Sequence, residues 1–359
     1  MPRLGGSEMC IRDRLGIPLL FGFDVIHGYK TQSPIPLAES ASWDIKAIER
    51  SARLAAREAS AAGLNWTFAP MVDISRDSRW GRVMEGAGED PFLASMVASA
   101  RVRGFQGTDL SYSNTILACA KHFAGYGYVE AGRDYNTADT NEYTLFNTIM
   151  PPFKASVDAG VSTFMNSFNT VDEIPATGSS FLQRDILKGE WGFNGFVVSD
   201  WGSIGEMIPH GYAKNGAHAA EIAANAGSDM DMESSLYVNK LNELVKNGKV
   251  EISVIDDAVK RILGVKYDLG LFEDPYKYCN EERERAVVGS KENQDAVLDI
   301  ASNDGTLLKI FQKNKIIWKI NINPAMYTAR MEVQDLYKTS YDFRSTDNTT
   351  TDANRITQY

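Results

Sequence analysis

Cysteine and histidine are scarce in this sequence, with 3 and 4 residues among 359. The cysteines, Cys10, Cys119 and Cys279, are too few and too widely separated to form a disulfide framework. The histidines show none of the paired spacings that are typical of metal sites. We therefore expect no metal site in the chain.

Basic clusters and long apolar runs are missing as well. The chain has 37 Lys and Arg against 47 Asp and Glu, a formal net charge of −10, and no grouping of basic residues stands out. Binding to phosphate backbones requires a basic face, so we expect no nucleic-acid partner and favour a neutral or weakly charged ligand. No run reaches the roughly 18 apolar residues of a membrane span, and no signal-peptide pattern is present. We expect no membrane partner.

The composition that is present, 43% hydrophobic and 23% charged residues, is typical of a globular protein with one large domain or two ordinary ones. Residues 1–14 show neither helical nor strand periodicity and look like translated adapter sequence, so we treat them as a non-native leader. Residues 15–290 are predicted to form the main domain, and 291–312 a helix and linker. Residues 313–359, rich in Thr, Asn and Asp, have no sustained period and are predicted to be disordered.

In the main domain, strand-like and helix-like segments alternate. The predicted strands are 16–24, 65–74, 116–123, 160–168, 195–200 and 228–233. The predicted helices are 45–62, 91–104, 145–158, 181–190, 217–226, one from Ser253, and one at 295–308. Loops are predicted around Pro34 and Pro36 and, from the charged composition, at 273–288. Such alternation indicates parallel strands joined by crossover helices.

Two α/β architectures fit this pattern, an open doubly wound sheet and a closed (β/α)8 barrel of the TIM type. Five strands end in polar residues, as expected when every strand points its carboxyl end at one rim: Asp24, Arg82 by way of its loop, Lys121 with His122, Asn169 and Asp200. The segment after the first strand, 22–28, is no nucleotide-binding fingerprint. The barrel is therefore favoured, although six strand–helix units are visible instead of eight, so we expect it to be incomplete at its start.

Asp200 closes the apolar stretch Gly195–Gly202, of sequence GFVVSDWG. Burial of an unpaired carboxylate costs several kcal/mol, so an acid at this position is either hydrogen-bonded structure or a reacting group. The stretch alone leaves both interpretations open.

Six segments in one order resemble the barrel domain of glycoside hydrolase family 3 β-glucosidases of the bacterial periplasmic type. They are GIPLLFGFDVIHGYKT (16–31), APMVDISRDSRWGRVMEGAGEDPFL (69–93), ACAKHFAGYG (118–127), GRDYNTAD (132–139), FVVSDWGSIGEM (196–207) and AANAGSDMDM (223–232). Each motif alone is a weak signal, whereas the ordered set is specific. The resemblance covers roughly residues 15–290.

The resemblance implies roles for individual residues. Asp200 would be the catalytic nucleophile, and Lys121 and His122 would supply donors to it and bind sugar hydroxyls. The remaining substrate-binding positions it implies are Asp24, Arg82, Phe168 and Trp201. Phe168 stands where the family often has an aromatic hydroxyl. No metal or organic cofactor is implied.

Most of these residues also have a purely structural interpretation. Asp24 could cap a helix, and Arg82 could pair with Glu85 or Asp90. Trp201 could stack on a pyranose or lie in the core. Glu206 and Glu233 lie near strand ends and could be considered for the role of catalytic acid. Glu206, however, fits better at the start of a helix, where its charge interacts favourably with the helix dipole.

The implied activity is that of a retaining exo-acting β-glucosidase, which hydrolyses terminal non-reducing β-D-glucosyl residues through a covalent glycosyl-aspartate intermediate. In the family, the acid/base Glu comes from an α/β sandwich after the barrel, so we expect this chain to lack it and to be impaired. The substrate would be a β-glucoside or oligosaccharide, and the full-length protein would be periplasmic or secreted. Alternatives are a β-xylosidase of the same family, a catalytically silent sugar-binding barrel and, less favoured because no phosphate loop follows the late strands, an aldolase-like barrel.

Overall fold

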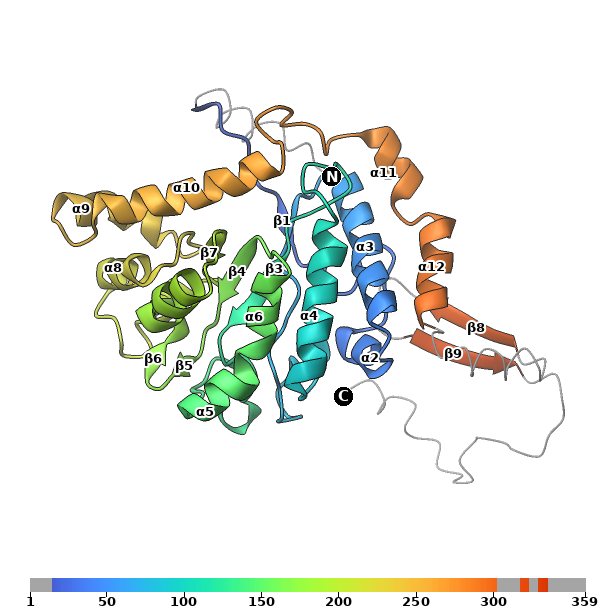
Figure 1. The fold of residues 1–359 in the computed structure, drawn as a ribbon, viewed down its shortest axis with the longest axis horizontal. Coiled ribbons are helices and arrows are strands. Elements are labelled where there is room, and N and C mark those ends of the chain that lie inside the picture. The colour runs from blue at the N-terminus through green and yellow to red at the C-terminus, as the bar shows by residue number, and fades with distance from the viewer. Residues whose placement is uncertain (1–14, 302–316, 323–328, 335–359) are drawn as a thin grey trace, which may run out of the picture. The chain divides into compact units, whose positions relative to one another are not determined.

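The structure, a computed structural model, describes residues 15–301, 317–322 and 329–334 (Figure 1). The predicted leader, residues 1–14, lies outside the described residues, as does most of the segment 313–359. The chain divides into two units at Asn303, which are described separately. In the second unit, β8 (Ile317–Ile322) pairs with β9 (Ala329–Gln334) as an antiparallel hairpin, where the sequence predicted no regular structure.

The first unit is built on a run of parallel strands. They are β1 (Gly22–Phe23), β2 (Trp66–Thr67), β3 (Cys119–Phe123), β4 (Thr163–Asn166) and β7 (Phe196–Val198). β1 pairs with β2, and β4 lies between β3 and β7. Parallel bridges extend the run from Trp66 to Leu117 and from Val198 to Met230. The chain therefore has six adjacent strand positions in sequence order, as predicted, and no pairing within residues 15–301 joins the first to the last.

Helices follow the strands and cover the outer side of the sheet. They include α3 (Ile45–Ala61), α4 (Pro91–Gln106), α6 (Pro151–Asp158), the π-helical η6 (Phe181–Glu190), α8 (Gly216–Ala226), α9 (Leu236–Lys246) and α10 (Ile252–Asp268). α3 packs against α4 and α4 against α6, side by side along β3 and β4 (Figure 1). Parallel strands alternating with outer helices are the TIM-type α/β arrangement, so the predicted fold class is confirmed.

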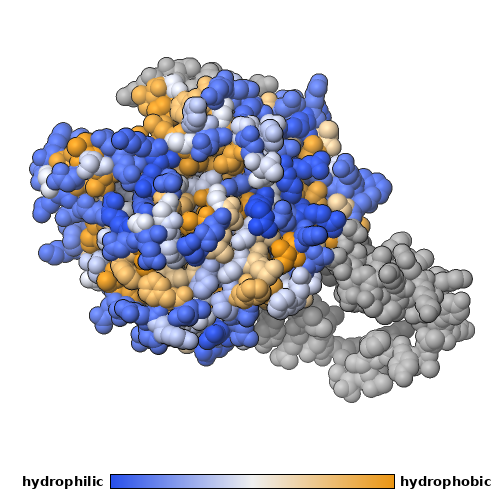
Figure 2. All heavy atoms as spheres, in the orientation of Figure 1, coloured by the Kyte–Doolittle hydropathy of each residue, from blue (hydrophilic) through white to orange (hydrophobic). Residues whose placement is uncertain are grey.

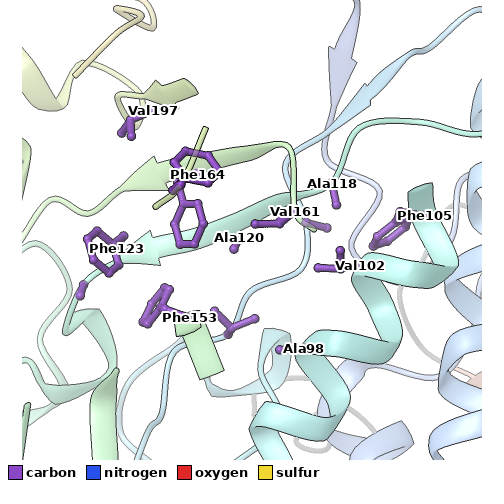
Figure 3. Close-up of a cluster of buried hydrophobic side chains, with 14 of the residues drawn as sticks. Ala98, Val102, Phe105, Ala118, Ala120, Phe123, Phe153, Val161, Phe164 and Val197 are labelled. Carbon is purple, nitrogen blue, oxygen red and sulfur yellow. The ribbon is translucent and has the colours of Figure 1, made fainter. Parts of the chain in front are cut away.

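The two faces of the strands bury different side chains. On the outer face, Ala118 and Ala120 lie in one cluster with Val102 and Phe105 of α4, and the Phe164 ring packs against those of Phe123 and of Phe153 in α6 (Figure 3). On the inner face, a second cluster surrounds the strand residues and receives side chains from α10; its members include Trp66, Leu117, Cys119, Met165, Phe196, Val198, Val265 and Leu269. This alternation follows from the two-residue period of a strand. It sets the polar strand ends above a packed inner core.

Local sequence explains where the principal helices begin and end. Asp44 accepts a hydrogen bond from the backbone N–H of Ala47 at the start of α3, and Asp90 does the same for Leu93 in α4. Pro91 occupies the first turn of α4, where no backbone donor is needed. Gly227 ends α8 with φ 105°, a conformation that suits glycine.

A buried ion pair holds the strand that leads to Asp200. Lys188 Nζ of η6 lies 2.7 Å from Asp229 Oδ1, and Asp229 Oδ2 accepts the backbone N–H of Val197 in β7 at 2.8 Å. Asp229 follows the Gly227 turn, so the end of α8 is tied to both β7 and η6.

Several predicted boundaries were wrong. The loop around Pro36 contains α2 (Pro36–Ala41), and the charged segment contains α11 (Glu281–Val287), which Asn280 caps by accepting the N–H of Arg283. α9 and the small hairpin of β5 (Thr170–Val171) and β6 (Ile174–Pro175) were not predicted. The last predicted helix, α12, is Lys291–Ala301 within the described residues.

The predicted helix 145–158 is divided. α5 (Glu142–Thr144) and the π-helical η4 (Leu145–Ile149) precede α6, which starts at Pro151. A proline lacks the N–H that would continue the preceding hydrogen-bond ladder, so a new helix begins there.

None of the described helices combines the length and the apolar run needed to cross a bilayer. Figure 2 shows one face, on which hydrophilic residues predominate and hydrophobic ones form separate patches.

Candidate active site

Polar side chains from three strand ends meet above the inner core. Asp200 follows β7, Lys121 and His122 lie in β3, and Asp24 follows β1. Lys121 Nζ lies 2.9 Å from Asp24 Oδ1, and His122 Nε2 lies 3.5 Å from Asp200 Oδ2. The structure therefore brings together four of the predicted site residues.

Asp200 is 8% exposed, and its two carboxylate oxygens differ. Oδ1 accepts the backbone N–H of Trp201 at 2.7 Å, whereas Oδ2 has no hydrogen-bond partner in the described part of the chain. Burial raises the pKa of Asp200 to about 6, against the Trp201 N–H and the charges of Lys121 and Arg82, which lower it. A carboxylate with one free oxygen and cations nearby can act on a ligand that reaches it.

A buried polar network fixes the backbone at Asp200. Asn166, at the end of β4, accepts the N–H of Asp200 at 3.4 Å and the hydroxyl of Thr177 at 3.0 Å through Oδ1. Its Nδ2 donates to Ser228 Oγ at 2.8 Å. The network links β4, β7 and the turn after α8, and it was not predicted from the sequence.

His122 is fully buried and contacts a second carboxylate that the sequence analysis missed, Asp73. Asp73 Oδ2 accepts the backbone N–H of His122 at 2.9 Å and lies 2.8 Å from its Nδ1. Burial raises the pKa of Asp73 to about 7. Burial and the positive charges of Arg82 and Lys121 lower the pKa of His122. The signal in the sequence was an acid inside the apolar run Ala69–Ile74.

Lys121 and Asp24 form an ion pair with unequal exposure, 5% for the Lys121 side chain and 59% for that of Asp24. The helix-cap interpretation of Asp24 is wrong, because the next helix, α2, has Ile35 at its N-cap. Asp24 thus presents its carboxylate to solvent at the strand end.

Arg82 makes the loop contact considered for it. Its Nε and Nη2 donate to the two carboxylate oxygens of Glu85 at 2.7 and 3.1 Å. Its guanidinium also lies over the Tyr126 ring, 5.5 Å from the centroid. The positive charge of Arg82 lowers the pKa of Asp200. Arg82 therefore forms the structural ion pair with Glu85 and at the same time lies close enough to influence Asp200.

The two aromatic candidates differ in burial. Trp201 is 66% exposed, so the core interpretation is wrong for this residue. Phe168 is 6% exposed and packs edge-on against Tyr135, with ring centroids 4.7 Å apart. Tyr135 is half exposed at φ 63°, and its aromatic ring close to the site was not predicted.

The other polar residues near the strand ends are Asn169, Glu206 and Glu233. Asn169 donates through Nδ2 to the carbonyl of Ala124, so its side chain holds neighbouring loops together. Glu206 lies in the one-turn helix α7 (Ser203–Glu206), and its pKa is raised by burial and by the charge of Asp200. Glu233 has a left-handed backbone with φ 77°. Within the described residues, no group of three or more His, Cys, Asp or Glu could hold a metal ion.

A TIM-type sheet with a buried carboxylate, a lysine and a histidine at its carboxyl rim places this chain in the class of glycoside-hydrolase barrels. The family model described as "Glycosyl hydrolase family 3 N terminal domain" matches residues 6–265. The chain belongs to glycosyl hydrolase family 3, and the predicted family is confirmed.

Curated relatives carry two kinds of name. The chain is 43% identical over 306 residues to the periplasmic beta-glucosidase of Salmonella typhimurium, an alignment that covers 84% of this chain and 40% of that protein. It is 33% identical over 318 residues to a beta-xylosidase of Formosa agariphila, covering 83% and 44%. The chain therefore spans less than half the length of these relatives.

Solved structures agree with the fold. The beta-glucosidase from Listeria innocua in complex with isofagomine matches with a TM-score of 0.78 at 43% identity, covering 81% of this chain and 42% of that one. The same enzyme in complex with glucose matches with a TM-score of 0.78 at 42% identity, covering 86% and 41%.

Proposed function

We propose that this chain carries the nucleophile half of a retaining β-glucosidase site, in which Asp200 attacks the anomeric carbon of a terminal β-D-glucosyl residue. The observation that carries the proposal is the free Oδ2 of Asp200, buried beside His122 at a rim of polar strand ends. Attack by this oxygen would form a covalent glycosyl-aspartate and release the aglycone.

The neighbouring residues have the chemistry to bind a neutral sugar. Asp24 can accept hydrogen bonds from two vicinal hydroxyls, while Lys121 and Arg82 can donate. The same two cations lower the pKa of Asp200 against its burial, which keeps a fraction of the nucleophile ionised near neutral pH. Trp201, exposed next to the nucleophile, offers a face for stacking.

A retaining mechanism also requires a proton donor, with its carboxyl group about 5–5.5 Å from the nucleophile. Asp24 is paired with Lys121, Glu85 with Arg82, and Asp73 with His122. We infer that the donor comes from outside the described residues. Activated leaving groups, which depart without a proton, are then the substrates on which this chain acts best, since general acid catalysis contributes roughly 10²–10⁴-fold.

The test is the intact mass of the chain after incubation with a 2-fluoro-glucoside that bears an activated leaving group, with circular dichroism on the same sample. We expect one adduct, mapped to Asp200 and absent from Asp200→Asn. A folded chain without an adduct would contradict retained glycosylation chemistry. It would favour the second candidate, a sugar-binding barrel without catalysis, if the chain still bound glucose.

A β-xylosidase is the other candidate, because the beta-xylosidase of Formosa agariphila is also a relative. Parallel incubation with a 2-fluoro-xyloside decides between them, since the preferred glycone gives the faster adduct. The higher identity to a periplasmic beta-glucosidase favours glucose. It also supports a periplasmic or secreted location for the full-length protein, which fractionation of the source cells would test.

A further inference from the structure

Asp73 is a buried carboxylate that touches the site through His122. It is 2% exposed and follows β2 in the loop toward Arg82. A single oxygen, Oδ2, receives both contacts from His122: the backbone N–H at 2.9 Å and Nδ1 at 2.8 Å. Asp73 therefore touches the same histidine at two atoms.

These contacts decide which ring nitrogen carries the proton. Burial raises the pKa of Asp73 to about 7, but Oδ2 already accepts the backbone N–H of His122, so Oδ2 is the accepting oxygen both in the ionised carboxylate and with a proton on Oδ1. Nδ1 therefore donates to Oδ2, and a neutral ring then has a bare lone pair at Nε2. Burial and the charges of Lys121 and Arg82 oppose a second proton on the ring. The ring plane is held by an edge-to-face contact with Tyr126, with centroids 5.1 Å apart.

Nε2 and Asp200 Oδ2 are thus two acceptors that face one another across 3.5 Å, and neither has a hydrogen-bond partner in the described part of the chain. Two converging acceptors suit a ligand that brings donors, as sugar hydroxyls do. The sequence had suggested that His122 donates to the nucleophile. The geometry indicates the opposite role.

We propose that Asp73 is a positioning residue that fixes His122 as a hydrogen-bond acceptor at Nε2, so that the ring receives a sugar hydroxyl and does not donate to Asp200. The sugar part of this inference rests on the proposed function. The charged groups around the trio are Lys121 and Arg82 on the positive side and Asp24, Glu85 and Glu206 on the negative side.

Removal of Asp73 has a distinctive consequence. Without the acceptor at Nδ1, the proton can move to Nε2, which then donates to Asp200. A hydrogen bond to the ionised form lowers the pKa of a carboxyl group. The acid limb of adduct formation at Asp200 is therefore expected to move to lower pH in Asp73→Ala, while sugar binding weakens by roughly 10-fold. Loss of packing alone would not move the limb downward.

The first measurement needs no substrate. Two-bond ¹H–¹⁵N spectra of the full chain, labelled at histidine and recorded above pH 7, report the protonation of each ring nitrogen. The His122 signals are assigned by their absence from His122→Gln. We expect a protonated Nδ1 and a bare Nε2 in the wild type, and a protonated Nε2 in Asp73→Ala. A protonated Nε2 in the wild type would overturn the proposal.

Two further variants complete the test. Asp73→Asn can present its carbonyl oxygen to Nδ1, so it should keep the wild-type tautomer, and it remains informative if Asp73→Ala does not fold. Asp77→Asn, in the same loop and paired with Arg79, is the matched control and should change neither the spectrum nor the pH profile.

The outcomes for tautomer and function are separable. The wild-type tautomer without any adduct at Asp200 would leave the assignment of Asp73 standing and contradict the proposed function. An adduct on a chain with a protonated Nε2 would do the reverse.

Discussion

The ammonium group of Lys121 lies 2.9 Å from Asp24 Oδ1, which joins the end of β3 to the residue after β1. Lys121 is buried and Asp24 is exposed, so it is Lys121 that brings a positive charge close to Asp200. The charge of Lys121 lowers the pKa of Asp200 more than the charge of Asp24 raises it, and so acts against the effect of burial. Lys121 therefore helps to keep the nucleophile ionised.

Replacement of Lys121 by Met is expected to raise the pKa of Asp200 above about 6. If the pKa rises by about one unit, adduct formation with the 2-fluoro-glucoside should slow by roughly 5-fold at pH 6 and by up to roughly 10-fold at lower pH, and its acid limb should move to higher pH, because the ionised fraction falls tenfold per pKa unit only well below the pKa. The rate is measured by intact mass across the pH range. Lys154→Met, on the exposed face of α6, is the control, and an unchanged limb in Lys121→Met would contradict this role.

Asp200→Asn is expected to stabilise the chain near neutral pH while it abolishes the adduct. The pKa of Asp200 is about 6 in the folded chain against an ordinary 3.8, so the folded state binds the proton more tightly than the unfolded state. Stability from this group is present below pH 3.8 and is lost as the pH rises through 6. The neutral amide avoids that loss and can donate to His122 Nε2.

The expected gain in the free energy of unfolding is about 1–3 kcal/mol near pH 7, and it should shrink toward pH 4. Urea unfolding at both pH values measures it. A variant destabilised equally at both would show that the carboxylate is needed for the fold.

Trp201→Ala should separate binding from stability. The side chain is 66% exposed, so the free energy of unfolding should change by less than about 0.5 kcal/mol. Half-maximal labelling should require a roughly 10-fold higher concentration of the 2-fluoro-glucoside, because the indole stacks on the ligand. Trp43→Ala, at 63% exposed, is the matched control. Equal labelling curves for Trp201→Ala and the wild type would remove Trp201 from the site.

The sequence predicted the strands and the residues at their ends better than it predicted the buried residues that hold the site in place. Six strand positions and the residues at their ends followed from alternation, and the strand ends bring Asp24, Lys121, His122 and Asp200 together. Asp73 was missed because it lies within a predicted strand, where an acid is indistinguishable from ordinary buried structure until its partner in space is known. Its partner is 49 residues away in the sequence.

The exposure of individual side chains and the presence of short helices could also not be predicted from the sequence. Trp201 directly follows a buried residue, Asp200, and yet its side chain is exposed in a turn whose next residue, Gly202, has φ 71°. The short helices α2 and α11 lie in proline-rich or charged segments, whose composition is shared with loops. Their helical state depends on packing against neighbouring elements, including α3 for both.

Glu206 is the remaining carboxyl group whose environment resembles that of a proton donor, because burial and the charge of Asp200 raise its pKa. If the donor lies outside the described residues, Glu206→Gln should leave adduct formation unchanged within about twofold for activated leaving groups. It should also slow poorly activated leaving groups no more than activated ones. A proton donor would behave differently, since its loss slows the reaction roughly 10²–10⁴-fold when the leaving group needs a proton.

The measurement is the ratio of adduct rates for two aryl 2-fluoro-glucosides of different leaving-group acidity, in wild type and Glu206→Gln. The ratio also guards against a simple loss of fold, which would slow both substrates alike. A change in the ratio would place the acid within this chain and make it a complete catalytic unit.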